Sequence, residues 1–156
     1  MRLSEILTRD RVSIEKITSK SEAIKQIACL LGADLPPEIL PKIVAVLEER
    51  EADQSTGIGD GVAIPHAFLN DVPERRAALL VVPDGVDFNA IDKRSTTILL
   101  GVIAPKKQVQ EQFNHLWLLT RLSKLLRESA LRHQIIGAPS AEDVYRAVCE
   151  ADEKLA

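Results

Sequence analysis

The sequence predicts one α/β domain over residues 1–156, in which helices cover a central sheet. Short, β-branched apolar segments at 77–82 and 96–103 have the composition of buried strands. Segments with helical spacing of apolar residues lie before and after these strands. The chain of 156 residues is 46% hydrophobic and 28% charged, which suits one globular domain with a substantial core.

In the first half of the chain, apolar spacing and helix stop signals predict two helices. Residues 21–31 put apolar side chains on one helical face, and Gly32 follows as a stop. Pro36 and Pro37 open a second helix that ends near Glu51, and Pro41 delays its start or disturbs its first turn. The remaining expected elements are a helical turn at 4–7, a strand at 12–14, a loop at 53–61 and a short apolar segment at 62–64.

The second half of the chain is predicted to pair two strands and then continue in helices. Pro83-Asp84-Gly85 predicts a turn between the strands at 77–82 and 96–103. Helical patterns follow at 109–127, at 130–136 and from about 140 to 153.

Charge and cysteine content exclude several classes of protein. Lys plus Arg total 20 and Asp plus Glu total 23, and a net charge of −3 argues against nucleic acid as the main partner. No apolar run is long enough to insert into a membrane, and no signal peptide is visible. Cys29 and Cys149 lack the spacing of a zinc or redox pair, so we expect two core thiols in the reducing cytoplasm.

A glycine-rich segment, Ser55-Thr56-Gly57-Ile58-Gly59-Asp60-Gly61, precedes Pro65-His66. Glycines let backbone N–H groups approach an anion closely, and the two hydroxyls are further donors. The segment matches neither the P-loop nor the dinucleotide-binding fingerprint. On the pattern alone it is either an ordinary loop or an anion-binding loop.

Two histidines are candidates for the chemistry. A neutral imidazole nitrogen is a good phosphoryl acceptor near pH 7, and Pro65 stiffens the backbone before His66. His115 shares a helical stripe with several leucines of the segment 109–127, so we expect it to point inward. Each could instead be a structural histidine whose ring nitrogens bond to the backbone.

Arg50 extends the apolar stripe of the second helix formed by Ile43, Val46 and Leu47. Its stem can pack on the core while its guanidinium reaches the edge of a site and binds phosphate oxygens in bidentate fashion. The alternative is a solvated charge within the acidic run around it.

Taken together, these residues resemble a known family. The run from Arg50-Glu51 to Pro65-His66, with Ser-Thr-Gly-Ile-Gly-x-Gly-Val-Ala-Ile between, is similar to the signature of enzyme IIA of the fructose–mannitol class. That class belongs to the bacterial phosphoenolpyruvate:sugar phosphotransferase system. The run His115-Leu116-x-Leu118-Leu119-x-x-Leu122 resembles the family's second-histidine helix.

The resemblance implies an α/β sandwich with a mixed central β-sheet flanked by helices. It implies that His66 carries the phosphoryl group, that His115 supports transfer, and that Arg50 holds the phosphoryl oxygens. Ser55, Thr56 and Gly57 would complete the phosphoryl-binding site. No cofactor or metal is expected, because the donor already carries an activated P–N bond.

The resemblance also implies the partners. The donor would be the phosphocarrier HPr or a paralogue, and the acceptor an enzyme IIB domain in sugar transport or a set of regulated proteins. Because the chain carries no IIB or IIC portion, we favour the nitrogen-regulatory branch. Gln54 and Ala67 replace glycines common in relatives and blur the subfamily.

Other functions remain open. A purely regulatory binding module is compatible with the same residues. A metalloenzyme using His66, His115 and His133 lacks ligand spacing, and a Ser55/His66 hydrolase lacks an acidic partner for a triad. For docking a partner, the candidates are Phe68, Leu69 and Trp117, unless these are core residues.

Overall fold

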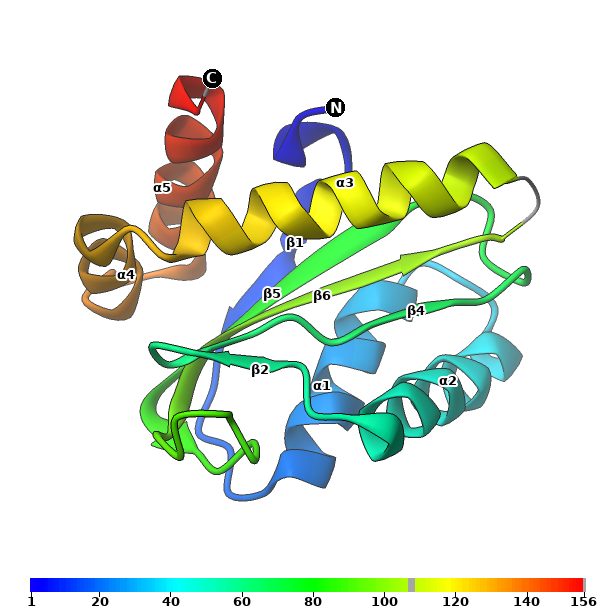
Figure 1. Ribbon diagram of the computed structural model, residues 1–156, viewed down its shortest axis with the longest axis horizontal. Helices are drawn as coiled ribbons and strands as arrows, with labels where there is room; N and C mark the ends of the chain where they lie inside the picture. Colours follow the sequence, from blue (N-terminus) through cyan, green and yellow to red (C-terminus); the bar gives the residue numbers. More distant parts are fainter. Residues whose placement is uncertain (107–108, 156) are drawn as a thin grey trace.

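The computed structural model describes residues 1–106 and 109–155. Short 3-10 turns at Leu3–Glu5 and Pro37–Ile39 accompany the main elements, which Figure 1 shows. The strands are β1 (Leu7–Ile14), β2 (Gly57–Gly59), β3 (Val62–Ala63), β4 (His66–Phe68), β5 (Arg76–Val86) and β6 (Thr96–Ala104). The helices are α1 (Lys20–Gly32), α2 (Leu40–Asp53), α3 (Val109–Leu126), α4 (Ser129–Ile136) and α5 (Ala141–Lys154).

The six strands form one mixed sheet, as expected. Its order is β1-β5-β6-β3-β2, and β4 also pairs with β6. The central pair, β5 and β6, is antiparallel, whereas β1 is parallel to β5, and β3 and β4 are parallel to β6. The two short strands β3 and β4 therefore lie one after the other along the same side of β6.

Two hydrophobic cores lie on opposite faces of the sheet because successive strand residues point to opposite sides. Ile98, Leu100 and Val102 of β6 pack with α3, α4 and α5. Leu99 and Ile103 pack with α1 and α2. Figure 1 shows the resulting three layers, with α1 and α2 on one side of the sheet and the last three helices on the other. This arrangement confirms the predicted α/β sandwich.

At Gly101 in β6, helix α1 approaches the sheet very closely. A Cβ atom there would collide with the Cγ2 methyl of Ile27, which is fully buried. We expect Gly101→Ala to lower the free energy of unfolding by about 3 kcal/mol, because the packed layers cannot separate freely. Urea denaturation measures the loss.

Ile27→Leu supplies the matching control, because leucine carries no second γ-carbon. The double variant should recover part of the stability lost in Gly101→Ala. Strictly additive losses would contradict the assigned contact.

Helix α3, which carries His115, is fixed at both ends. Arg121 donates from Nε to Asp152 Oδ1 of α5 at 3.0 Å, and the same carboxylate accepts the backbone N–H of Leu3 at 2.7 Å. Near the other end, Arg75 Nη2 donates to the carbonyl oxygen of Glu111 at 3.1 Å. The helix is thereby held in a defined position over the sheet.

Several sequence-based expectations need correction. β1 begins at Leu7 rather than near residue 12, with a register irregularity between Leu7 and Val12. The segment Pro83-Asp84-Gly85 is not a turn but an irregular part of β5, which pairs again at Val86 with Thr96. Gly85 has φ +79°, a conformation that glycine adopts at low cost in such a bulge.

The structure confirms the predicted helices and one of the two predicted core thiols. Cys149 is buried as expected, but Cys29 is exposed, so the prediction of a core residue was wrong for it. The five predicted helices are confirmed, and α2 begins at Leu40, directly before Pro41. Within the described residues, no helix combines the length and apolar character needed to cross a bilayer.

Candidate phosphoryl-transfer site

His66 is the first residue of β4 and stands opposite Val102 of β6. The backbone N–H of Val102 donates to the carbonyl oxygen of Pro65 at 2.9 Å, which anchors the preceding residue to the sheet. The ring Nδ1 lies 2.7 Å from the carbonyl oxygen of Ile64. A carbonyl oxygen only accepts, so Nδ1 carries the proton and Nε2 keeps its lone pair.

His115 points inward, as the helical stripe predicted, and its ring lies beside that of His66. Its side chain is buried, with 5% exposed, and the ring centroids of the two histidines are 5.5 Å apart. The ring of Phe68 packs against that of His115, with a distance of 4.4 Å between their centroids. Among the described residues, neither ring nitrogen of His115 has a hydrogen-bond partner. Such an unsatisfied buried group calls for a ligand or a water molecule.

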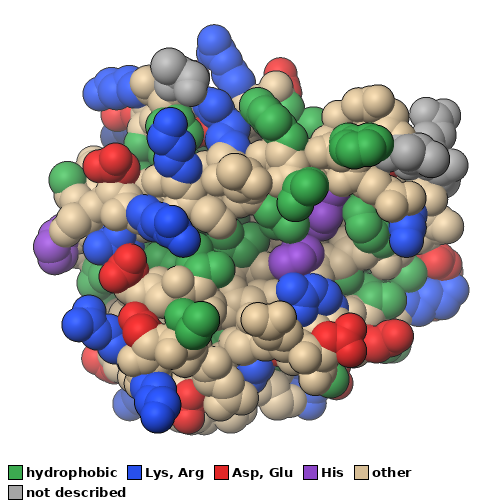
Figure 2. All heavy atoms as spheres, viewed as in Figure 1, with side chains coloured by type: hydrophobic (Ala, Val, Ile, Leu, Met, Phe, Trp, Pro, Cys, Tyr) green, Lys and Arg blue, Asp and Glu red, His purple; other side chains and the backbone are tan. Residues whose placement is uncertain are grey.

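Arg50 completes the cluster from the last turn of α2. Its Nη1 donates to the carbonyl oxygen of Gln54 at 2.8 Å, and the side chain is half-buried. A cavity of about 390 Å³ brings the three predicted residues together; it is lined by Val46, Glu49, Arg50, Asp53, His66, Ala67, Phe68 and His115. In the face of the molecule that Figure 2 shows, two histidine side chains lie together near the middle, next to basic and hydrophobic side chains.

Both imidazoles are held neutral near pH 7. The pKa of His66 is lowered, mainly by burial. The hydrogen bond to the Ile64 carbonyl raises this pKa, whereas the Arg50 cation lowers it further. Burial also lowers the pKa of His115 to about 4, helped by His66 and Arg75. A neutral ring with a free Nε2 is the state that can attack phosphorus.

The loop residues predicted to bind phosphoryl oxygens make other bonds in this structure. The Ser55 hydroxyl donates to the carbonyl oxygen of Phe88 at 2.8 Å. The Thr56 hydroxyl and N–H both donate to Glu51, at 2.6 and 2.8 Å. Gly57 begins the strand β2, and its N–H donates to Ser55 Oγ at 3.1 Å. A phosphoryl-binding role for these three residues stays a prediction.

Comparison with known proteins shows the family of the chain. The sequence model of the family described as "Phosphoenolpyruvate-dependent sugar phosphotransferase system, EIIA 2" matches residues 5–151. The chain belongs to this family. It is a phosphotransferase component that acts as a phosphocarrier.

Relatives of this EIIA chain include proteins of the nitrogen-regulatory branch. A "Nitrogen regulatory protein" of Pseudomonas aeruginosa is 34% identical over 152 residues, covering 96% of both chains. The crystal structure of nitrogen regulatory protein IIA-Ntr from Neisseria meningitidis has a TM-score of 0.81 at 26% identity, covering 92% of this chain and 97% of that one.

The fold is also that of a sugar-specific relative. Mannitol enzyme IIA of Escherichia coli, solved in complex with phosphorylated enzyme IIB, has a TM-score of 0.73 at 20% identity. The alignment covers 93% of this chain and 99% of that one. At this identity the likeness shows the fold alone.

Sequence reasoning on this EIIA chain missed Glu51 as part of the site's support. Glu51 is buried, and its carboxylate forms an ion pair with Lys20 Nζ at 2.9 Å. The signal was present in the helical spacing, because Ile43, Leu47 and Glu51 follow one another at intervals of four residues. The stripe that located Arg50 also predicts a buried Glu51.

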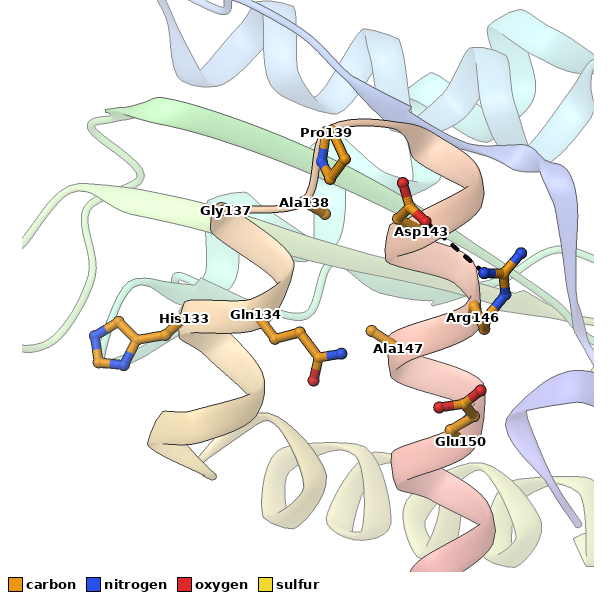
Figure 3. A pocket seen from close by; sticks show the side chains of 9 residues that line it. All are labelled: His133, Gln134, Gly137, Ala138, Pro139, Asp143, Arg146, Ala147 and Glu150. Atoms are coloured by element: carbon orange, nitrogen blue, oxygen red, sulfur yellow. Dashed lines mark ion pairs between the residues drawn. The ribbon is translucent and has the colours of Figure 1, made fainter.

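The metal-site alternative finds no support in the geometry of the EIIA chain. His133 belongs to a different hollow of about 480 Å³ between α4 and α5. Figure 3 shows its ring pointing away from α5, where Asp143 and Arg146 form an ion pair at 3.9 Å. Residues 1–106 and 109–155 contain no cluster of three or more His, Cys, Asp or Glu side chains placed to hold a metal.

Proposed function

We propose that His66 accepts the phosphoryl group on Nε2 from the phosphohistidine of HPr or an HPr paralogue. The observation that carries this proposal is the 2.7 Å bond from Nδ1 to the Ile64 carbonyl, which leaves the Nε2 lone pair available. The new bond forms between Nε2 and phosphorus while the donor's P–N bond breaks. The donor ring keeps the electron pair of that bond. The step needs no metal or nucleotide, because the P–N bond of the donor is already activated.

We propose that Arg50 and His115 both act on the transferring group. Phosphoryl transfer depends mainly on positioning and on stabilising charge at the oxygens. The guanidinium of Arg50 lines the same cavity as the ring of His66 and supplies a permanent positive charge. His115, whose nitrogens have no partner among the described residues, can bond to a phosphoryl oxygen once the group arrives. We propose these roles for the two side chains.

The names of the relatives support two possible outputs of the phosphoryl group. The mannitol enzyme IIA was solved with phosphorylated enzyme IIB, whereas the more similar relatives are named nitrogen regulatory proteins. The identity of 34% over almost the full length of the Pseudomonas protein favours regulation as the physiological output of the phosphorylation state. An enzyme IIB domain remains the alternative acceptor.

A partly apolar surface on α3 can receive these partners. Phe113, Leu116 and Trp117 are exposed by 64%, 64% and 51% in the helix that carries His115. Trp117 therefore belongs to the surface, while Phe68 is only half-exposed and packs on His115. Aromatic side chains are common in the centres of protein interfaces. We expect these steps in the cytoplasm, in keeping with the free, exposed thiol of Cys29.

A reconstituted transfer reaction tests the proposal. The protein is incubated with labelled phosphoenolpyruvate, enzyme I and either HPr or its nitrogen-branch paralogue. We expect one acid-labile, base-stable label per chain that depends on the HPr-type protein. An unlabelled chain with both donors would refute the proposed function.

His115→Ala should leave acceptance from the donor largely intact and slow onward transfer about 10- to 100-fold, because one bond to the transferring oxygens is lost. Single-turnover transfer to the acceptor measures the second step. His133→Ala is the matched control and should transfer at the wild-type rate. Wild-type rates for His115→Ala in both steps would make this histidine purely structural.

A further inference from the structure

The carboxylate of Glu51, which does not line the cavity of His66, binds two donor groups of Thr56 and the ammonium group of Lys20. It accepts the N–H of Thr56 at 2.8 Å and its hydroxyl at 2.6 Å, and it pairs with Lys20 Nζ at 2.9 Å. The side chain of Glu51 is 5% exposed and that of Lys20 21%. A buried carboxylate is stable only when its partners are all present. Removing its charge therefore disturbs each of these bonds.

From Thr56 the hydrogen bonds continue to the reacting ring. The carbonyl oxygen of Thr56 accepts the N–H of Ile64 at 3.0 Å. The carbonyl oxygen of Ile64 then accepts the proton on His66 Nδ1 at 2.7 Å. One peptide residue, Ile64, thus links the loop to the imidazole through both of its backbone groups, and its side chain is 3% exposed.

Further contacts connect Ser55 and Lys20 to Phe88, in the segment that follows β5. Ser55, next to Thr56, donates to the carbonyl oxygen of Phe88, and Lys20 Nζ lies 4.7 Å from the centroid of the Phe88 ring. Lys20 is the first residue of α1, and Glu51 lies near the end of α2. The ion pair between Lys20 and Glu51 therefore connects α1, α2 and the loop that contains Thr56.

We propose that Glu51, with Lys20 beside it, is a positioning residue for the ring of His66. The ion pair holds Thr56, Thr56 holds Ile64, and the Ile64 carbonyl keeps the proton on Nδ1, so that Nε2 remains the nucleophile. This inference rests on the proposed phosphorylation of His66. It adds that the neighbours Arg50 and Glu51 both serve the site, Arg50 from within the cavity and Glu51 through the hydrogen bonds of Thr56 and Ile64.

The tautomer of His66 tests the inference directly. Nitrogen-15 NMR of the unphosphorylated protein, with imidazole-labelled histidine, reports which ring nitrogen carries the proton. We expect mainly Nδ1–H in the wild type and a measurable Nε2–H population in Glu51→Gln. Glutamine matches the shape of glutamate but presents an N–H group to a neighbouring donor. The rate of phosphorylation by the HPr-type donor should fall about tenfold, as for one lost hydrogen bond.

Further variants separate positioning from stability. Lys20→Met should act in the same direction as Glu51→Gln, and Thr56→Val should act more weakly, because it removes only the hydroxyl bond to Glu51. Glu48→Gln, at an exposed position of the same helix, is the control and should change neither tautomer nor rate.

The outcomes distinguish this inference from the proposed function. If Glu51→Gln and Lys20→Met lower the melting temperature but keep the wild-type tautomer and rate, Glu51 is structural only and the inference fails. If the wild-type protein takes up no label at His66, the proposed function fails, while the NMR spectra still report whether Glu51 sets the ring tautomer.

Discussion

Replacing His66 with alanine is expected to abolish phosphoryl uptake, a fall on the order of 10⁴-fold or more. No other residue at the site can take over. The second imidazole, His115, is buried with 5% exposed and packs against Phe68, so its ring is far less accessible to a donor protein than that of His66. Labelling from phosphoenolpyruvate through enzyme I and the HPr-type donor measures the loss.

The His66→Ala variant should remain folded, because His66 is half-exposed at the start of a short strand. A wild-type circular dichroism spectrum and melting curve would establish this. His133→Ala, on the far hollow between α4 and α5, controls for the loss of a histidine as such and should be labelled normally. An acid-labile label that persisted in His66→Ala would show that another residue is the acceptor.

Arg50→Ala is expected to slow phosphoryl transfer by about 10²- to 10³-fold, the usual effect of removing one preorganised donor from developing charge. The guanidinium sits in the cavity with both histidines, held by its bond to the Gln54 carbonyl. Arg50→Lys should recover only part of the rate, because an ammonium group cannot bind two oxygens in a fork. Rapid-quench kinetics of uptake measure these rates.

Two controls isolate the role of Arg50 in charge stabilisation. Added guanidinium ion, at concentrations too low to unfold the protein, should restore part of the activity of Arg50→Ala. Lys42→Ala removes a cation from the exposed start of the same helix and should have no effect on the rate. Equal losses in Arg50→Ala and Lys42→Ala would attribute the effect to net charge rather than to contact with the phosphoryl group.

The helical and strand periodicities could be read from the sequence because they follow from local geometry. The leucine stripe of α3 placed His115 inward, and the stripe of α2 placed Arg50 at its edge; both residues line the cavity. The same regularity explains the error at Cys29. It lies next to the buried face of α1 rather than on it, so its thiol is exposed although cysteine is usually a buried residue.

Other features depend on contacts that no local pattern contains. Pro83-Asp84-Gly85 has the composition of a turn, yet pairing of Val86 with Thr96 keeps it in β5. The hydroxyls of Ser55 and Thr56 were expected to face the phosphoryl group, whereas they bond to Phe88 and Glu51. The partner of Ser55 lies 33 residues further along the chain, so no local pattern reveals it.

The account depends on Nε2 of His66 being the atom that carries the phosphoryl group. Phosphorus-31 and nitrogen-15 NMR of the phosphorylated protein identify the bonded nitrogen directly. The structure predicts a phosphohistidine at Nε2 of His66, with the proton retained on Nδ1 beside the Ile64 carbonyl. A phosphoryl group on Nδ1 of His66, or on any other side chain, would contradict it.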